Sequence, residues 1–201
     1  MDPRPWHKFY TEGIPLDVVD ESLALPQLLD RTAARWPDRV ATIFEGGKVT
    51  YAQLKDGADR LATALVALGI QPGDRVAIQL PNLPQAVIAY YGVLRAGAVA
   101  VMTNPLYVSR ELEHHFNDSG VKAAILLDAF WVKTVRDLRP QLKTLQPVIL
   151  TKLVDWLPFP KKKLFPLVDK THALVVCVDT TAKVLWRQDQ KKQHSPNPPE
   201  I

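Results

Sequence analysis

The chain has 201 residues, 47% of them hydrophobic and 23% charged, which suits one sizeable buried core and argues against a disordered chain. Its single cysteine, Cys177, excludes an internal disulfide and a cysteine-based zinc site, and it favours a reducing, cytoplasmic compartment. The net charge of +4 arises entirely after Pro160 and forms no extended basic patch with interleaved aromatics, so nucleic-acid binding is not expected.

A small antiparallel element is predicted near the start of the core. Two β-prone runs between Val40 and Thr50 flank Gly46-Gly47, and this pair indicates a hairpin because glycine reaches positive φ without steric cost. Leucine and alanine then recur at helical spacing over residues 54–68. Thr50 suits the N-cap of this amphipathic helix, and Gly69 suits the position after its end.

Strand-like and helix-like stretches alternate after the turn at residues 71–74. The expected strands are residues 75–80, 98–102, 123–127 and 148–151, and the expected helices are residues 83–95, 109–117 and 129–142. This alternation favours an α/β fold with a mostly parallel sheet, flanked by helices and reached through right-handed crossovers.

The character of the sequence changes from Trp156 onward. Prolines at positions 158, 160 and 166 exclude a regular helix there and predict a surface loop. Residues 173–178 are expected to form another strand, and residues 183–186 are expected to pair with a neighbour. Residues 188–201 are polar and contain prolines, which predicts a disordered tail.

Several common catalytic patterns are absent. No G-x-G-x-x-G follows a strand, and Gly47-Lys48 lacks the upstream glycine of a phosphate-binding P-loop. None of the four serines lies in a G-x-S-x-G elbow. His114 and His115 are neighbours on an expected helix and would point about 100° apart, whereas helical metal ligands are three or four residues apart. We expect these histidines to be solvated or packed.

Membrane contact is a further hypothesis. The first residues lack the pattern of a secretory signal, and no apolar run approaches the roughly 18 residues of a spanning helix, so a soluble or peripheral protein is expected. Lys161-Lys162-Lys163 is flanked by aromatic and leucine residues that could sit at an anionic membrane surface. A solvated loop is the alternative interpretation.

Several strings closely resemble bacterial long-chain-fatty-acid-CoA ligases, which are adenylate-forming enzymes. The matching stretches are residues 10–15, 49–54, 73–77, 81–82, 94–101, 104–107, 110–114, 117–120, 149–151 and 157–160. The resemblance runs in order from about Trp6 to about Lys170 and fades after Thr171. It implies that a fatty carboxylate and ATP form an acyl-adenylate and pyrophosphate, with magnesium, and that coenzyme A then displaces AMP.

The family's catalytic segments have no match in this sequence. They are a Ser/Thr/Gly-rich loop ending in Pro-Lys-Gly, later motifs for adenine, ribose and magnesium, and a C-terminal domain with a catalytic lysine. We therefore assign no catalytic, cofactor-binding or metal residue. Tyr51 as a helix cap, Gly97 at a helix-to-strand turn and Asn104-Pro105 at a strand end are interpreted as scaffold.

The resemblance also suggests a domain organisation. Residues 1–20 would be an N-terminal arm, residues 21–155 part of an AMP-dependent synthetase/ligase domain, residues 156–187 a loop and strands of that domain, and residues 188–201 the tail. We expect a ligase fragment that is inactive alone, because losing even one preorganised donor costs a factor of about 10² to 10³ in rate. Its partners would be fatty acid, CoA and a complementing ligase fragment. A non-catalytic acyl-binding or ligase-partner module is the alternative.

Overall fold

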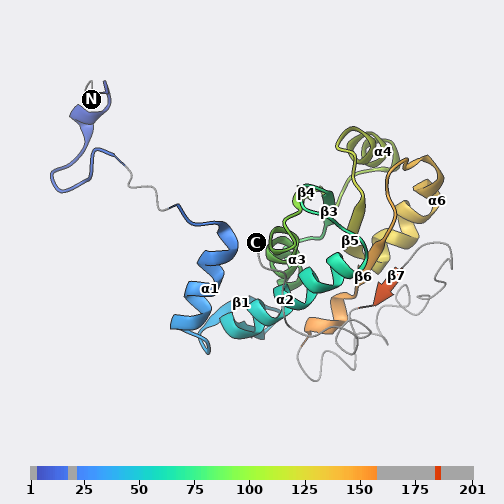
Figure 1. The fold of residues 1–201 in the computed structure, drawn as a ribbon, viewed down its shortest axis with the longest axis horizontal. Coiled ribbons are helices and arrows are strands. Elements are labelled where there is room, and N and C mark those ends of the chain that lie inside the picture. Colours follow the sequence, from blue (N-terminus) through green and yellow to red (C-terminus); the bar gives the residue numbers. More distant parts are fainter. Residues whose placement is uncertain (1–3, 18–21, 158–183, 187–201) are drawn as a thin grey trace.

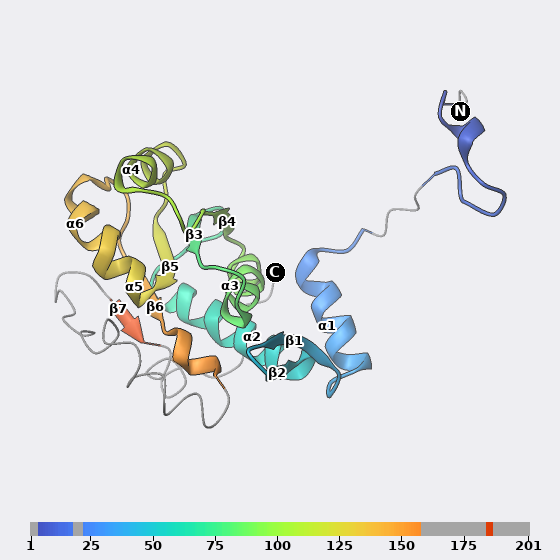
Figure 2. The same cartoon turned by 180° about the vertical axis from the view of Figure 1, so that it is seen from behind.

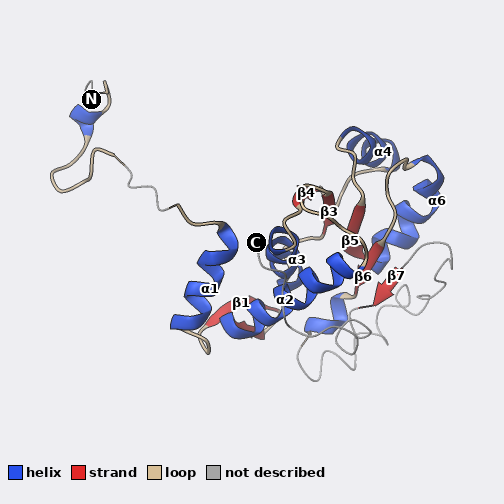
Figure 3. Ribbon diagram, viewed as in Figure 1, coloured by secondary structure: helices blue, strands red, loops and turns tan. Residues whose placement is uncertain are grey.

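The structure is a computed structural model that describes residues 4–17, 22–157 and 184–186 (Figure 1). Residues 4–17 form an arm with one short 3-10 turn, His7–Phe9, and Figures 1 and 2 show this arm lying apart from the sheet. The remaining described residues form a hairpin, a parallel sheet and helices on both sheet faces (Figure 3).

The predicted hairpin is confirmed, with one difference in its turn. Strand β1 (Val40–Phe44) pairs antiparallel with β2 (Gly47–Thr50). The two turn residues are Glu45 and Gly46, both at positive φ, because Phe44 pairs with Gly47 and leaves only these two between the strands. Positive φ at both central residues is the geometry whose twist matches that of the flanking strands.

The predicted amphipathic helix is α2 (Tyr51–Ala67). Thr50 caps it: its Oγ1 accepts from the backbone N–H of Gln53 at 3.3 Å, and its own N–H donates to Gln53 Oε1 at 3.0 Å. Tyr51, which we expected to cap the helix, is its first residue, and its N–H donates to the Arg39 carbonyl at 3.0 Å. The helix ends before Gly69, which has a φ of 86°.

The parallel strands and the helices between them also follow the prediction. The strands are β3 (Arg75–Gln79), β4 (Val99–Met102), β5 (Ala123–Leu127), β6 (Val148–Thr151) and β7 (Val184–Trp186). Helix α3 (Pro84–Arg95) connects β3 to β4, and α4 (Ser109–Asp118) connects β4 to β5. All pairings in this sheet are parallel, in the order β4-β3-β5-β6-β7, so residues 184–186 of the stretch expected to pair do pair with β6.

Two apolar cores lie on the two faces of the sheet. Side chains that alternate along β3, β5 and β6 divide between them: Val76, Ile78 and Ile125 contact α2 and α3, whereas Ala77, Ala124 and Leu150 lie with α4. The two clusters are almost fully buried. Burial on both faces explains why the strands are continuous apolar runs rather than alternating patterns.

Two helical segments differ from expectation. The single helix expected at residues 129–142 consists of short pieces: α5 (Asp128–Phe130), a π-helical segment (Trp131–Val135), α6 (Arg136–Leu138) and a 3-10 turn (Arg139–Gln141). The α-helix ends there because Pro140 has no N–H to donate to the preceding turn. Helix α1 (Leu25–Arg35) was not predicted, and only Pro26, Leu29 and Ala33 of it are buried.

After β6 the structure describes one short turn and strand β7. After β6 comes a 3-10 turn, Leu153–Trp156. The expected lysine cluster at residues 161–163, the expected strand at residues 173–178 and the expected tail at residues 188–201 lie outside the described residues. No helix within the described ranges is long and apolar enough to span a membrane.

An ion pair at the amino edge of the sheet should make the stability of the fold depend on pH. The Lys122 ammonium donates to Asp74 Oδ2 at 2.6 Å, and the backbone N–H of Gln71 donates to the same oxygen at 2.7 Å. The Lys122 hydrogen bond first, and the Gln71 hydrogen bond second, lower the pKa of Asp74 below its usual value. The carboxylate is therefore more acidic in the folded state than in the unfolded chain.

We expect Asp74→Asn to weaken the acid sensitivity of folding. Above an unfolded-state pKa of about 3.9 both states are ionised and the stabilisation is complete. Below it the unfolded chain takes up the proton first, so stability falls as the pH approaches the lower folded-state value. Urea unfolding of both proteins between pH 7 and pH 2 measures this. An equal decline in the unfolding free energy of the two proteins would contradict it.

Candidate functional site

The strand order identifies the edge of the sheet where a ligand would bind. From β3 the chain crosses over α3 to β4 on one side, and then crosses over α4 to β5 on the other side of β3. The two helices lie on opposite faces, as their separate cores show. In open α/β sheets, ligands bind beyond the carboxyl ends of the strands at such a reversal. The carboxyl edge of β3, β5 and β6 is therefore the candidate site.

Buried polar side chains are concentrated at this edge. Gln79 ends β3, Thr103 follows β4, Asp128 follows β5 and Thr151 ends β6, and all four are at least nine-tenths buried. Thr103 is turned back on its own strand, where its hydroxyl donates to the Val101 carbonyl at 3.2 Å. Asp128 Oδ1 accepts from the Ala129 N–H at 2.8 Å. Among the described residues, Gln79 Oε1 and Thr151 Oγ1 have no hydrogen-bond partner.

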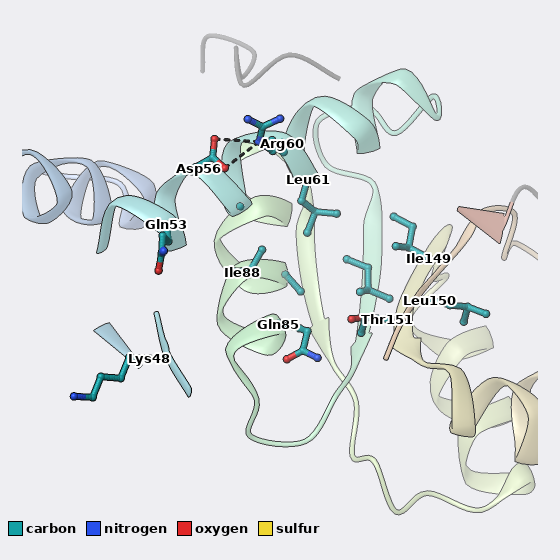
Figure 4. A pocket seen from close by; sticks show the side chains of 13 residues that line it. Lys48, Gln53, Asp56, Arg60, Leu61, Gln85, Ile88, Ile149, Leu150 and Thr151 are labelled. Carbon is teal, nitrogen blue, oxygen red and sulfur yellow. Dashed lines mark hydrogen bonds and ion pairs between the residues drawn. The ribbon is translucent and has the colours of Figure 1, made fainter. Parts of the chain in front are cut away.

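A pocket of about 320 Å³ opens between α2, α3 and the strands β5 and β6 (Figure 4). Its aliphatic wall is formed by Gly57, Leu61, Ile88, Ala89, Ile125 and Ile149. A volume of this size lies at the lower end of the range for small-molecule sites. The pocket can therefore accept a small, largely apolar molecule.

Two buried polar residues, Gln85 and Thr151, lie at one end of this pocket (Figure 4). Gln85 is the second residue of α3 and is 5% exposed, while Thr151 is 6% exposed. The Gln85 amide Nε2 donates to the Lys152 carbonyl at 3.1 Å, and this contact fixes the side chain. Within the described part of the chain, Gln85 Oε1 has no partner.

The mouth of the pocket carries an ion pair on the exposed side of α2. Arg60 Nε donates to both carboxylate oxygens of Asp56, at 3.0 and 2.9 Å (Figure 4). These hydrogen bonds raise the pKa of Arg60 further above its usual value, so the guanidinium stays charged. Lys48 of β2 and Gln53 are exposed at the same mouth. Charge is therefore confined to the rim, and the interior is neutral.

The residues singled out from the sequence occupy structural positions. Gly97 has a φ of 70° between α3 and β4, as expected. Asn104 follows β4, and its Oδ1 accepts from the Leu106 N–H at 3.0 Å. His114 is exposed, whereas the His115 ring packs 5.6 Å from that of Tyr107. None of these residues lines the pocket.

Among the described residues, no group of three or more His, Cys, Asp or Glu could hold a metal ion. The residues that do line the pocket's polar end, Gln85 and Thr151, were not selected from the sequence. The available signal was a polar residue ending the apolar strand at residues 148–151 and one at the start of α3.

Comparison with known proteins finds a matching family model and several similar ligases. The family model described as AMP-binding enzyme matches residues 29–200. A long-chain-fatty-acid–CoA ligase of Bacillus subtilis is 40% identical over 181 residues, which cover 90% of this chain and 32% of the relative. A ligase of the same name from Salmonella typhimurium is 36% identical over 156 residues, covering 77% and 28%. This chain therefore spans about a third of the length of these relatives.

Solved structures agree on the fold. The anthranilate CoA ligase AuaEII, solved in complex with anthranoyl-AMP, superposes with a TM-score of 0.60 at 21% identity, covering 68% of this chain and 27% of that one. At this identity the likeness concerns the fold alone. It confirms the predicted architecture of a mostly parallel sheet flanked by helices, with a hairpin beside it.

Proposed function

This chain belongs to the family of AMP-binding enzymes, and we propose that it forms part of a ligase that joins a fatty acid to coenzyme A with ATP. The observation that carries the proposal is the identity of 36–40% to long-chain-fatty-acid–CoA ligases over most of the chain. The sheet order supports it, because the reversal beside β3 places a binding edge at the carboxyl ends of the strands.

We propose further that the 201 residues do not carry out adenylation by themselves. Activating a carboxylate with ATP requires donors and cations arranged around the phosphates. The sequence has no glycine-rich phosphate loop, and the described residues offer no set of ligands for magnesium. The buried polar groups Gln79, Gln85 and Thr151 are neutral and cannot supply that charge. The chain's contribution would be the scaffold on which the reacting groups are assembled.

We also propose the domain organisation that the resemblance suggests. Residues 21–155 would be one folding unit of the ligase, with residues 156–187 belonging to it and residues 1–20 forming a separate arm. Strand β7 supports placing residues 156–187 in this unit, because Val184–Trp186 pairs with β6 and so extends the same sheet. Trp6 and Phe9 of residues 1–20 are exposed, which is compatible with a separate arm.

Oleate-dependent exchange of pyrophosphate into ATP tests the catalytic part of the proposal. We expect the purified chain with magnesium to show exchange at least about 10² to 10³ times slower than an equal amount of the Bacillus subtilis ligase, because several phosphate donors are lacking and each is worth about that factor. Exchange within about tenfold of the relative would show that the chain holds a phosphate site of its own.

A further inference from the structure

We propose that the outer edge of β4 pairs with the same edge of a second copy of this chain, so that two sheets join across a twofold axis. This inference goes beyond the proposed ligase function and does not depend on it. It rests on the open edge of the sheet, on the uncharged residues along it and on the symmetry of its outward backbone groups.

Strand β4 ends the sheet on one side, and β3 is its only strand neighbour among the described residues (Figures 1 and 2). Its end residues are exposed, Val99 to 47% and Met102 to 56%. Val99 shares the sheet face of Val101, which packs with the α4 core, and Met102 shares the face of Ala100, which packs with the core of α2 and α3. The described helices therefore leave this edge open on both faces.

The residues along this edge lack the usual protection against pairing. Residues 98–102 read Ala-Val-Ala-Val-Met, without a charge or a proline. Natural edge strands are commonly protected by charged side chains, prolines or bulges. The strand at the opposite edge, β7, has three residues, and a lysine and an arginine flank it in the sequence. The β4 edge is therefore suited to pairing with another strand.

Hydrogen bonds on the β3 side show which backbone groups of β4 remain available. The N–H of Val99 donates to the carbonyl of the residue before β3 at 2.8 Å, and the N–H of Thr103 donates to the Ile78 carbonyl at 3.1 Å. The direction of these groups alternates along a strand, so the odd-numbered residues face β3. Ala100 and Met102 therefore direct their N–H and C=O groups away from the sheet, where no described strand pairs with them.

These outward groups are symmetric about Val101, and this symmetry identifies a second copy as the partner. In an antiparallel pairing with a twofold axis at Val101, Ala100 of each chain lies opposite the partner's Met102. Each of these two pairs exchanges two N–H···O bonds, so every outward group of Ala100 and Met102 is satisfied. The small alanine also leaves room beside it for the longer methionine. Main-chain bonds of this kind provide the affinity when one strand adds to another.

The dimer should be weak, because β4 has only four residues and the interface is correspondingly small. We expect a dissociation constant on the order of 10–100 µM, measured by sedimentation equilibrium of the full chain between about 5 and 300 µM. A chain that stays monomeric over this range would overturn the proposal.

Cysteine cross-linking tests the register, in a Cys177→Ser background that removes the chain's only natural thiol. In the proposed pairing the Cα atoms of the two Val101 residues are about 4.5 Å apart, which allows a disulfide between two Val101→Cys chains. The Cα atoms of the two Val99 residues are offset by four positions along the strands, which places them roughly 13 Å apart or more.

Val99→Cys in the same background is therefore the control. Val99 is more exposed than Val101, so random collisions would favour its oxidation. We expect Val101→Cys to form at least about tenfold more covalent dimer than Val99→Cys under the same mild oxidation, because only the first pair lies within disulfide distance. Equal cross-linking of the two variants, or no cross-linking of Val101→Cys, would contradict the pairing.

Met102→Pro tests the hydrogen bonds themselves. Proline removes the N–H of residue 102, which points away from β3, and so it removes two of the four bonds of the dimer. The dissociation constant should rise at least about tenfold relative to Met102→Ala, which shortens the same side chain but keeps the N–H. Equal dissociation constants for the two variants would show that this edge does not form the dimer.

The part of a ligase outside this chain is the alternative occupant of the edge. We expect the Val101→Cys cross-link to persist when an equal amount of the Bacillus subtilis ligase segment outside the match is added. Loss of the cross-link in a mixed complex, with Met102→Pro weakening that complex, would assign the edge to the ligase and overturn the proposal. Neither outcome alters the pyrophosphate-exchange test of the purified chain.

Discussion

Replacing Arg95 with alanine is expected to lower the unfolding free energy by about 3–5 kcal/mol, the cost of breaking a buried ion pair by removing one of its two partners. Arg95 lies in the last turn of α3, where its side chain is 8% exposed. Its Nε lies 2.6 Å from Asp59 Oδ1 on α2, and its guanidinium also pairs with Asp30 on α1. One side chain therefore joins three helices.

The carboxylate at the centre of this network explains the size of the effect. Asp59 is 5% exposed in its side chain, and its other oxygen lies 2.6 Å from the Lys55 ammonium. Lys55 also lies 3.5 Å from Asp30, so two cations balance two anions. Removing Arg95 leaves a net negative charge in a site with little access to water. Ordering of α1, which has few buried apolar residues, should be lost with it.

Urea unfolding monitored by circular dichroism measures this change, and Arg60→Ala is the matched control. Arg60 also pairs with an aspartate on α2, at 2.9 Å, but the Asp56 side chain is 49% exposed. An exposed pair of this kind contributes about 0–1 kcal/mol. If Arg95→Ala costs no more than Arg60→Ala, the three-helix network does not stabilise the fold.

The second large effect is expected for Gly92→Ala, which should destabilise the protein by about 2 kcal/mol. The added Cβ would lie within 3.0 Å of three Leu61 atoms, including Cβ at 2.9 Å, which cannot move without the backbone of α2. Overpacking of this kind costs about 1–3 kcal/mol, and the better helix propensity of alanine returns at most about 1 kcal/mol. The contact between α2 and α3 should therefore loosen.

Gly57→Ala is the appropriate comparison at the same helix contact. Its Cβ would meet only the Ile88 side chain, with Cδ1 at 3.0 Å and Cγ1 and Cγ2 at 3.3 Å, so a shift of that side chain by a few tenths of an ångström relieves the contact. Gly57→Ala should therefore stay within about 1 kcal/mol of the unchanged protein. Thermal or urea unfolding of both variants measures the difference. Equal stabilities of Gly57→Ala and Gly92→Ala would contradict the close packing at Gly92.

The sheet and most of its helices could be predicted because their signals are local. Strands β3 and β5 are short apolar runs between turn residues, and α2 combines helical spacing with Thr50 before it and Gly69 after it. Helix α1 could not be predicted in this way, because only Pro26, Leu29 and Ala33 in it are buried and its Asp30 pairs with a residue far along the chain. Tertiary contacts rather than local pattern hold that helix.

The polar end of the pocket depends on contacts that no local pattern contains. Gln85 and Lys152 are 67 residues apart in sequence and meet only because α3 lies against the end of β6. The sequence shows a glutamine at a helix start and a threonine at a strand end, which are common residues in those positions. A glycine-rich phosphate loop, in contrast, is a property of residue strings, and the sequence contains none.

We propose that this chain supplies the scaffold of a fatty-acyl-CoA ligase whose phosphate-binding groups lie outside these residues. The most direct measurement is oleate-dependent pyrophosphate exchange by this chain mixed with the part of the Bacillus subtilis ligase that lies outside the matched segment, with each polypeptide alone as the control. We expect exchange in the mixture, and exchange at least about 10² to 10³ times slower from either polypeptide alone. Exchange by this chain alone within about tenfold of the intact ligase, or none from a mixture that forms a stable complex, would contradict the proposed role of this chain.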